Sequence, residues 1–188
     1  MRITGGTLKG RTFPVPVGII RPAMERMRES VFAVLGDLTG ASFLDFFSGS
    51  GIIAMEAASR GAVYLETVES DKHKRKTLLD NTAFSPVRIH CRFMPVELYI
   101  RRARRSFDFI FCDPPFTHQY KTELLDRIGT SPLMNNTSLL MIHRPKKEQF
   151  MKQIVQENLL LKETRYYGNS AVDFFLKFPP DFQNIKKT

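Results

Sequence analysis

The chain has 188 residues, of which 43% are hydrophobic and 25% charged, a composition that indicates one globular domain and excludes a disordered chain. Lys and Arg number 28 against 19 Asp and Glu, so the net charge of +9 favours a polyanionic partner. No apolar run is long enough to cross a membrane and no N-terminal signal is evident, which predicts a cytoplasmic protein. Cys91 and Cys112 lie in apolar runs and predict reduced core thiols, not a disulfide or a metal site.

Residues 1–22 form a basic extension that differs from the rest of the chain. Glycine and proline recur at Gly5-Gly6, Gly10, Pro14 and Pro16, which is typical of turns and short extended pieces and excludes a helix. A hairpin involving residues 11–15 fits this spacing. From residue 23 to residue 35 the apolar side chains recur at helical spacing and predict an amphipathic helix.

Strands and helices then alternate. Apolar runs predict strands at residues 42–47, 63–69, 87–93, 107–112 and 139–143, with helices at 52–59, 72–82, 96–104, 120–128 and 148–157. Two last strands, 160–166 and 172–178, are joined by the turn Gly168-Asn169 and predict an antiparallel pair. The expected fold class is α/β: a Rossmann-like, seven-stranded, mostly parallel sheet with helices on both faces and an antiparallel C-terminal hairpin. The domain is expected to span residues 23–178, followed by a frayed tail at 179–188.

The tetrapeptide Asp113-Pro114-Pro115-Phe116 directly follows the predicted strand 107–112. An acidic side chain at the carboxyl end of a strand lies where open α/β folds bind ligands. The prolines fix φ and lack N–H groups, so the peptide forms a stiff shelf with a carboxylate, carbonyl oxygens and an aromatic face. Such a shelf can accept both hydrogens of a planar amine, such as the exocyclic NH2 of a nucleobase. A simple turn after a strand explains the tetrapeptide equally well when it is taken alone.

A glycine turn, Asp45 to Gly51, joins the first predicted strand to the following helix. Gly49 and Gly51 allow a tight turn and close approach of a ligand, and amides at a helix start can bind an electron-rich group. The flanking positions of a full dinucleotide motif are not glycine, which favours a nucleoside ligand. Glu69, at the end of the second strand, can accept hydrogen bonds from ribose hydroxyls. In the usual doubly wound order the first strand lies beside the fourth, so the glycine turn and the shelf would face each other.

Together with other matches along nearly the whole chain, these motifs resemble the class I S-adenosylmethionine-dependent methyltransferases. More narrowly, the chain resembles the RsmD-type enzymes that methylate guanine N2 in bacterial small-subunit ribosomal RNA. The most specific matches are Arg2-Ile3-Thr4-Gly5-Gly6, Lys9-Gly10-Arg11, Arg21-Pro22, Glu25-Arg26 and Arg28-Glu29. Further matches are Glu56-Ala57, Ser59-Arg60-Gly61-Ala62, Tyr120 and Tyr167-Gly168-Asn169.

The resemblance implies S-adenosylmethionine as cofactor and ribosomal RNA as substrate, either free or in an assembled small-subunit particle. The residues that it implies for cofactor binding are Asp45, Phe47, Ser48, Gly49, Ser50, Gly51, Glu69 and Ser70. It also implies that Asp113 and Pro114 bind the target amine, with Pro115 in the shelf and Phe116 stacked on the base. The basic residues expected to contact RNA phosphates are Lys9, Arg11, Arg21, Arg26 and Arg28.

The chain departs from the family pattern at three places. Residues 90–94 carry no acid where the family often contacts the adenine ring, and Ala23 and the segment before Arg21 lack the usual threonine-bearing pattern. His143-Arg144-Pro145-Lys146 stands where the family often has a glutamate. The histidines show no metal-binding spacing, and only His118 is predicted to lie near the shelf. The basic run at residues 101–105 is typical of a solvated helix face and could also bind RNA phosphates.

Two other functions remain open at this point. A DNA adenine-amine methyltransferase could use the same shelf, although 188 residues leave little room for a recognition domain. An RNA-binding module with a vestigial cofactor pocket is the non-enzymatic alternative, and the intact Asp113, Gly49 and Gly51 argue against it. We expect a monomer that requires no metal.

Overall fold

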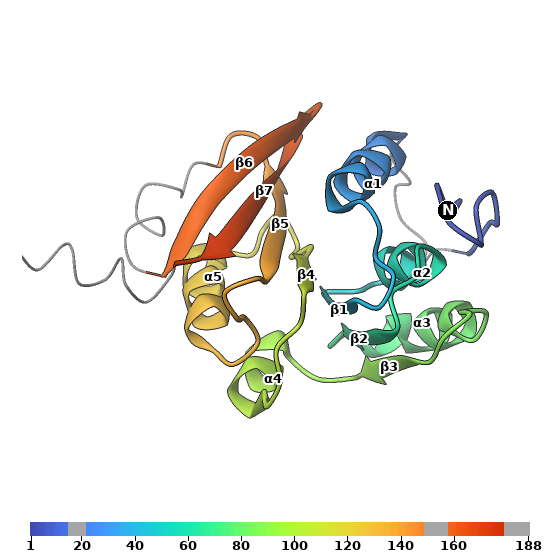
Figure 1. Cartoon of the computed structure of the whole chain (residues 1–188), viewed down its shortest axis with the longest axis horizontal. Helices are drawn as coiled ribbons and strands as arrows, with labels where there is room; N and C mark the ends of the chain where they lie inside the picture. The colour runs from blue at the N-terminus through green and yellow to red at the C-terminus, as the bar shows by residue number, and fades with distance from the viewer. Residues whose placement is uncertain (15–21, 149–157, 179–188) are drawn as a thin grey trace, which may run out of the picture. The chain divides into compact units, whose positions relative to one another are not determined.

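A computed structural model describes residues 1–14, 22–148 and 158–178 (Figure 1). The chain divides into two compact units, Met1–Val96 and Glu97–Thr188, which are described separately. The predicted helix at 148–157 lies almost entirely outside the described residues, as do Arg21, the segment before it and the predicted tail. In the part that is described, no helix is long and apolar enough to span a membrane.

The first unit is a parallel three-stranded arrangement with helices packed on it. Its strands follow the order β3-β2-β1, with Asp45 of β1 opposite Thr67 of β2 and Thr67 opposite Cys91 of β3. Helices α2 and α3 pack on these strands, and α1 packs on α2 (Figure 1). The elements are α1 Pro22–Leu35, β1 Ser42–Phe46, α2 Ile52–Ser59, β2 Tyr64–Val68, the 3₁₀ turn η1 Lys72–Lys74, α3 Arg75–Thr82 and β3 Ile89–Arg92.

The second unit pairs a parallel strand couple with an antiparallel hairpin. Strands β4 and β5 are parallel, β5 and β7 are antiparallel, and β6 closes the hairpin with β7 (Figure 1). Gly168, in the turn between β6 and β7, has a φ of 59°, which a glycine adopts without strain. The elements are α4 Val96–Arg102, β4 Phe109–Cys112, α5 Lys121–Thr130, β5 Leu139–Pro145, β6 Leu159–Tyr167 and β7 Ser170–Lys177.

The observed elements confirm the predicted fold class, with seven strands that are mostly parallel and an antiparallel C-terminal pair. The predicted hairpin of the N-terminal extension is present as a short antiparallel pairing: a bridge joins Arg2 to Thr12, and the Ile3 and Phe13 amides donate to the carbonyls of Arg11 and Met1 at 2.9 and 2.8 Å. Cys112 is a buried free thiol, as predicted, whereas Cys91 is free but only half-buried because it lies on the outer strand β3.

Helix α2 is the most deeply packed element of the first unit, and all eight of its residues are buried. It therefore carries a charge, Glu56, into the core. Glu56 is compensated there by Arg28 and Arg60 and by the backbone N–H of Thr4, 2.8 Å from its Oε1 atom. A buried carboxylate requires such partners, since an unpaired charge in the core is strongly destabilising.

This packing explains the Gly5-Gly6 motif structurally. A Cβ atom on Gly6 would lie 1.8 Å from the backbone oxygen of Ser59, because the N-terminal segment runs directly against the end of α2 (Figure 1). The amide of Thr7 donates to that same Ser59 oxygen at 2.7 Å. The first residues of the chain are thus anchored to α2 by close backbone contact.

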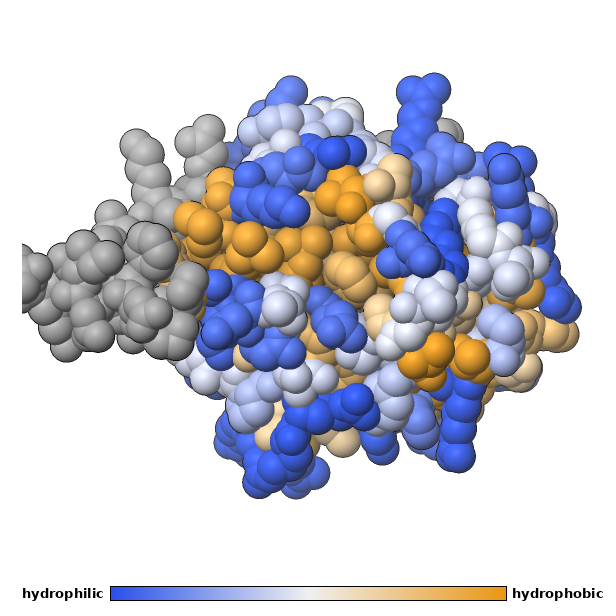
Figure 2. Space-filling model, viewed as in Figure 1, coloured by the Kyte–Doolittle hydropathy of each residue, from blue (hydrophilic) through white to orange (hydrophobic). Residues whose placement is uncertain are grey.

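Hydrophilic side chains cover most of the face shown in Figure 2, with an apolar area over the strands of the second unit. Leu160 and Tyr166 of β6 are among the exposed large apolar residues, at 40% and 59% exposure.

Candidate active site

The glycine turn between β1 and α2 has a backbone that alternates in handedness. Phe47, Gly49 and Gly51 have positive φ values of 60°, 56° and 78°, and the residues between them do not. For the non-glycine Phe47 this conformation costs about 1–2 kcal/mol, so the surrounding structure must enforce it. Alternation of this kind turns successive N–H groups toward one side and creates a concave site for an anion or carboxylate.

Two side chains, Ser48 and Asn81, hold the turn in place. Ser48 Oγ donates to the Asp45 carbonyl at 2.6 Å and accepts from the Val68 amide at 3.1 Å. Asn81 of α3 donates from Nδ2 to the Ser50 carbonyl at 2.8 Å. Asp45, Ser48 and Ser50 are all buried. The first unit therefore brings the predicted residues of the turn together in a preorganised loop.

Glu69 is part of the same arrangement. Its carboxylate is 4% exposed and accepts from the Gly49 amide at 2.9 Å and from the Asp71 amide at 2.8 Å. Each carboxylate oxygen has further acceptor capacity, so Glu69 can bind two ribose hydroxyls while it holds the turn. Ser70, the next residue, is exposed. Asp71 caps the following turn by accepting from the His73 amide at 2.9 Å.

The space around the two glycines differs. A Cβ atom on Gly49 would find no atom closer than the Phe47 oxygen at 4.0 Å, whereas one on Gly51 would lie 2.6 Å from Leu78 Cδ1. Open space therefore adjoins Gly49, whereas a side chain at Gly51 would meet Leu78 and Thr82 of α3 in addition to the strain of its φ of 78°. A nest of amides beside a buried carboxylate fits a ligand that carries both a carboxylate and ribose hydroxyls, and S-adenosylmethionine carries both.

The shelf lies at the carboxyl end of β4 in the second unit. Asp113 is partly exposed, Pro114 is buried, and Pro115 and Phe116 are exposed. The Pro115 carbonyl accepts from the His118 amide at 2.8 Å, which closes a turn. Within the described residues, no hydrogen bond uses the Pro114 carbonyl. The Asp113 carboxylate and this carbonyl are thus two acceptors at the end of β4.

Lys121 fixes the far side of the shelf, which sequence reasoning missed. Its side chain is 2% exposed, and Nζ donates to the carbonyls of Phe116 at 3.0 Å and His118 at 2.8 Å. It also contacts Glu148 Oε1 at 3.0 Å. A lysine at the start of a helix ordinarily faces solvent, so its sequence position carries no signal for this role.

His143 is a second buried polar residue at the shelf that the sequence analysis did not place there. Its Nδ1 atom lies 2.8 Å from Asp113 Oδ1, which corrects the expectation that only His118 lies near the shelf. The cause is register: β4 and β5 are parallel neighbours with Cys112 opposite Ile142, so the residues that follow them also lie side by side. Asp113 directly follows the apolar residues 109–112, and His143 directly follows the apolar residues 139–142; this repeated polar position is the signal that could have identified the pair.

The residues predicted to contact RNA differ in accessibility. Lys9, Arg11 and Arg26 are exposed, and the Arg11 guanidinium stacks on the Phe84 ring at 4.7 Å. Arg28 is 1% exposed and paired with Glu56. The prediction that Arg28 contacts RNA is therefore corrected, because its guanidinium neutralises a buried carboxylate. Nearby, a hydrogen bond from Arg2 lowers the pKa of Glu25 and ties α1 to the N-terminal segment.

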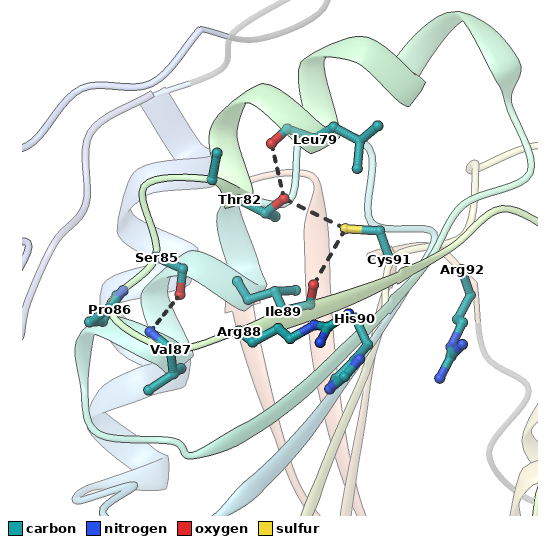
Figure 3. Close-up of a pocket in the computed structure, with 11 residues that line it drawn as sticks. Leu79, Thr82, Ser85, Pro86, Val87, Arg88, Ile89, His90, Cys91 and Arg92 are labelled. Atoms are coloured by element: carbon teal, nitrogen blue, oxygen red, sulfur yellow. Dashed lines mark hydrogen bonds between the residues drawn. The ribbon is translucent and has the colours of Figure 1, made fainter.

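A cavity of about 640 Å³ lies beside strand β3, and none of the residues that line it is a predicted cofactor-binding residue. In Figure 3 the side chains of Arg88, His90 and Arg92 point to one side of the strand, while Cys91 points toward Thr82 on α3. The Arg92 guanidinium is paired with Glu66 at 2.8 Å. The cavity is therefore a basic trough along an outer strand, separate from the glycine turn.

The fold is shared with solved structures over nearly the whole chain. A protein from Escherichia coli assigned as a methyltransferase matches with a TM-score of 0.81 at 25% identity, covering 94% of this chain and 97% of that one. A hypothetical protein from Thermus thermophilus matches with a TM-score of 0.78 at 27% identity, covering 93% of this chain and 98% of that one. With the glycine turn and the shelf, this likeness defines a class I S-adenosylmethionine-dependent methyltransferase.

The family model described as Conserved hypothetical protein 95 matches residues 1–176, and the chain belongs to this family, that of the RsmD-type methyltransferases. Among curated relatives, the ribosomal RNA small subunit methyltransferase D of Escherichia coli K12 is 28% identical over 146 residues, covering 76% of this chain and 73% of the relative. The protein of that name from Haemophilus influenzae is 26% identical over 175 residues, covering 87% of each.

Proposed function

We propose that this protein transfers a methyl group from S-adenosylmethionine to the exocyclic N2 amine of a guanine in small-subunit ribosomal RNA. The observation that carries the proposal is the shelf, where the Asp113 carboxylate and the Pro114 carbonyl stand at the end of β4 beside the exposed ring of Phe116. The names of the curated relatives support ribosomal RNA as the substrate.

The chemical difficulty of this reaction is the amine itself. The lone pair of an exocyclic guanine amine is delocalised into the ring, so the nitrogen is a poor nucleophile. Asp113 and Pro114 can each accept one of its two N–H groups, which would favour a pyramidal nitrogen with its lone pair directed away from the shelf. Asp113 would also stabilise the positive charge that develops on nitrogen and receive the proton that is released.

The rest of the site positions the two reactants. Bound S-adenosylmethionine supplies a methyl group activated by a sulfonium. The amides of the glycine turn would hold the carboxylate of its methionine moiety, and Glu69 would accept its ribose hydroxyls. Phe116 would stack on the flipped-out base. The facing of the glycine turn and the shelf, which this reaction requires, stays a prediction from the doubly wound strand order.

The RNA itself would be held through its phosphates. Lys9, Arg11 and Arg26 are exposed, and the Arg11 guanidinium rests on the rings of Phe13 and Phe84, which leaves its edge open to an anion. Phosphate contacts would give affinity with little sequence preference, and choice of the target base would depend on the shelf.

A methyl-transfer assay with radiolabelled S-adenosylmethionine tests the proposal. The substrates are 16S ribosomal RNA and small-subunit particles from cells that lack this protein, and a duplex DNA serves as the control. We expect incorporation into at least one of the two RNA substrates, and N2-methylguanosine as the product after digestion and mass analysis. Label in DNA alone would support the adenine-amine alternative, and cofactor binding without any transfer would contradict the proposal.

A further inference from the structure

The shelf has a buried partner that the proposed chemistry has not used. His143, on β5, has a side chain that is 5% exposed, and its Nδ1 atom lies 2.8 Å from Asp113 Oδ1. The imidazole also contacts the Phe116 ring edge-on, with centroids 5.3 Å apart and an interplanar angle of 64°. One side chain thus touches both the carboxylate and the aromatic face of the shelf.

We propose that His143 is a positioning residue that donates an N–H from Nδ1 to Asp113 Oδ1 and thereby fixes the orientation of the catalytic carboxylate. The inference rests on the proposed function, because it assigns His143 a role in presenting the amine. An ionised carboxylate can only accept hydrogen bonds, so a contact of 2.8 Å requires that Nδ1 carry the hydrogen. With Oδ1 held in this way, Oδ2 is directed to the substrate.

The geometry explains why a carboxylate at this position needs support. The Asp113 side chain is 28% exposed, and the adjoining prolines fix the backbone but leave the carboxyl group able to rotate about χ2. A carboxyl group that rotates loses the alignment on which amine activation depends. A misplacement of about 1 Å costs on the order of 100-fold in rate. The hydrogen bond from His143 restricts this rotation, and the buried imidazole is shielded from competing water.

A purely structural role for His143 is the competing explanation, since the ring also packs against Phe116. Two substitutions separate the alternatives. His143→Leu keeps apolar bulk and removes the donor. His143→Asn loses most of the ring but places an amide N–H near the position of Nδ1. Packing alone predicts that Leu is the better replacement, whereas the hydrogen bond predicts that Asn is better.

The experiment measures single-turnover methyl transfer to ribosomal RNA and S-adenosylhomocysteine affinity by calorimetry for the full chain. We expect His143→Leu to lose about 100-fold in transfer rate with cofactor affinity unchanged, and His143→Asn to recover about tenfold of that loss. His118→Leu serves as the matched control. His118 lies in the loop that carries the shelf, but its ring is edge-on to Tyr120, so the transfer rate of this variant should stay within about twofold of the wild type. Wild-type rates for His143→Leu, or a slower rate for Asn than for Leu, would overturn the inference.

A second measurement depends neither on the His143 variants being folded nor on the reaction. Nitrogen-15 NMR of the histidine-labelled wild-type protein reports which ring nitrogen carries the hydrogen. We expect a protonated Nδ1 on His143 that changes its shift in Asp113→Ala, and an unprotonated Nδ1 would refute the donor role. An inactive wild type would contradict the proposed function, whereas an active wild type with an unprotonated Nδ1 would contradict only this inference.

Discussion

Replacing Lys121 by methionine is expected to loosen the shelf without affecting the glycine turn. The substitution keeps the apolar stem of a side chain that is 2% exposed, but it removes three contacts, with the Phe116 carbonyl, the His118 carbonyl and the Glu148 carboxylate. A buried acceptor left without its partner costs about 1–3 kcal/mol. Two part-buried carbonyls and one part-buried carboxylate at the lower end of that range give a loss of about 3 kcal/mol in unfolding free energy.

The kinetic consequence should exceed the effect on binding. With its anchor gone, the loop after Pro115 can shift, and a shift of about 1 Å at a reacting group costs on the order of 100-fold in rate. Urea denaturation gives the stability, calorimetry with S-adenosylhomocysteine gives the cofactor affinity, and single-turnover methyl transfer gives the rate. Arg127→Met is the matched control, since Arg127 lies on the same helix and is exposed. Equal stability and equal rates for Lys121→Met and Arg127→Met would refute the reasoning.

Three further changes probe other parts of the structure. Gly51→Ala should destabilise the protein by about 1–3 kcal/mol more than Gly49→Ala in thermal or chemical unfolding, because only Gly51 is packed against Leu78; equal losses would contradict this. Asp173→Ala should cost about 3–5 kcal/mol by removing the carboxylate that faces the buried guanidinium of Arg144, and a loss below about 1 kcal/mol in urea denaturation would contradict it. Arg11→Glu should weaken RNA binding and reduce the slope of log affinity against log salt by about one, whereas an unchanged slope would exclude a phosphate contact.

The sequence predicted the elements of the fold well because its signals are local. Apolar runs located all seven strands, and the turn Gly168-Asn169 located the antiparallel pair. Element ends differ by one or two residues, since the last residues of an apolar run need not pair. The predicted strand 63–69, for example, is reduced to Tyr64–Val68.

The residues that the sequence did not place correctly share a different property: each has a partner that is distant in sequence. Arg28 belongs to the core because Glu56, on another helix, requires a cation. Lys121 is buried because it meets loop carbonyls and Glu148. His143 reaches Asp113 through the register of two strands. Each pairing joins residues far apart in the chain, so composition and periodicity alone did not identify it.

Asp113 is the residue proposed to activate the amine. The decisive measurement compares Asp113→Ala with the wild type for S-adenosylhomocysteine affinity and for radiolabelled methyl transfer to ribosomal RNA. We predict cofactor affinity within a few fold of the wild type and a loss of about 100-fold or more in transfer, typical of removing one preorganised charge-stabilising group. Asp113→Asn keeps an acceptor but not the charge, so comparison of its transfer rate with that of Asp113→Ala separates the contribution of orientation from that of charge. Full methyl transfer by Asp113→Ala would contradict the assignment of the shelf as the catalytic site.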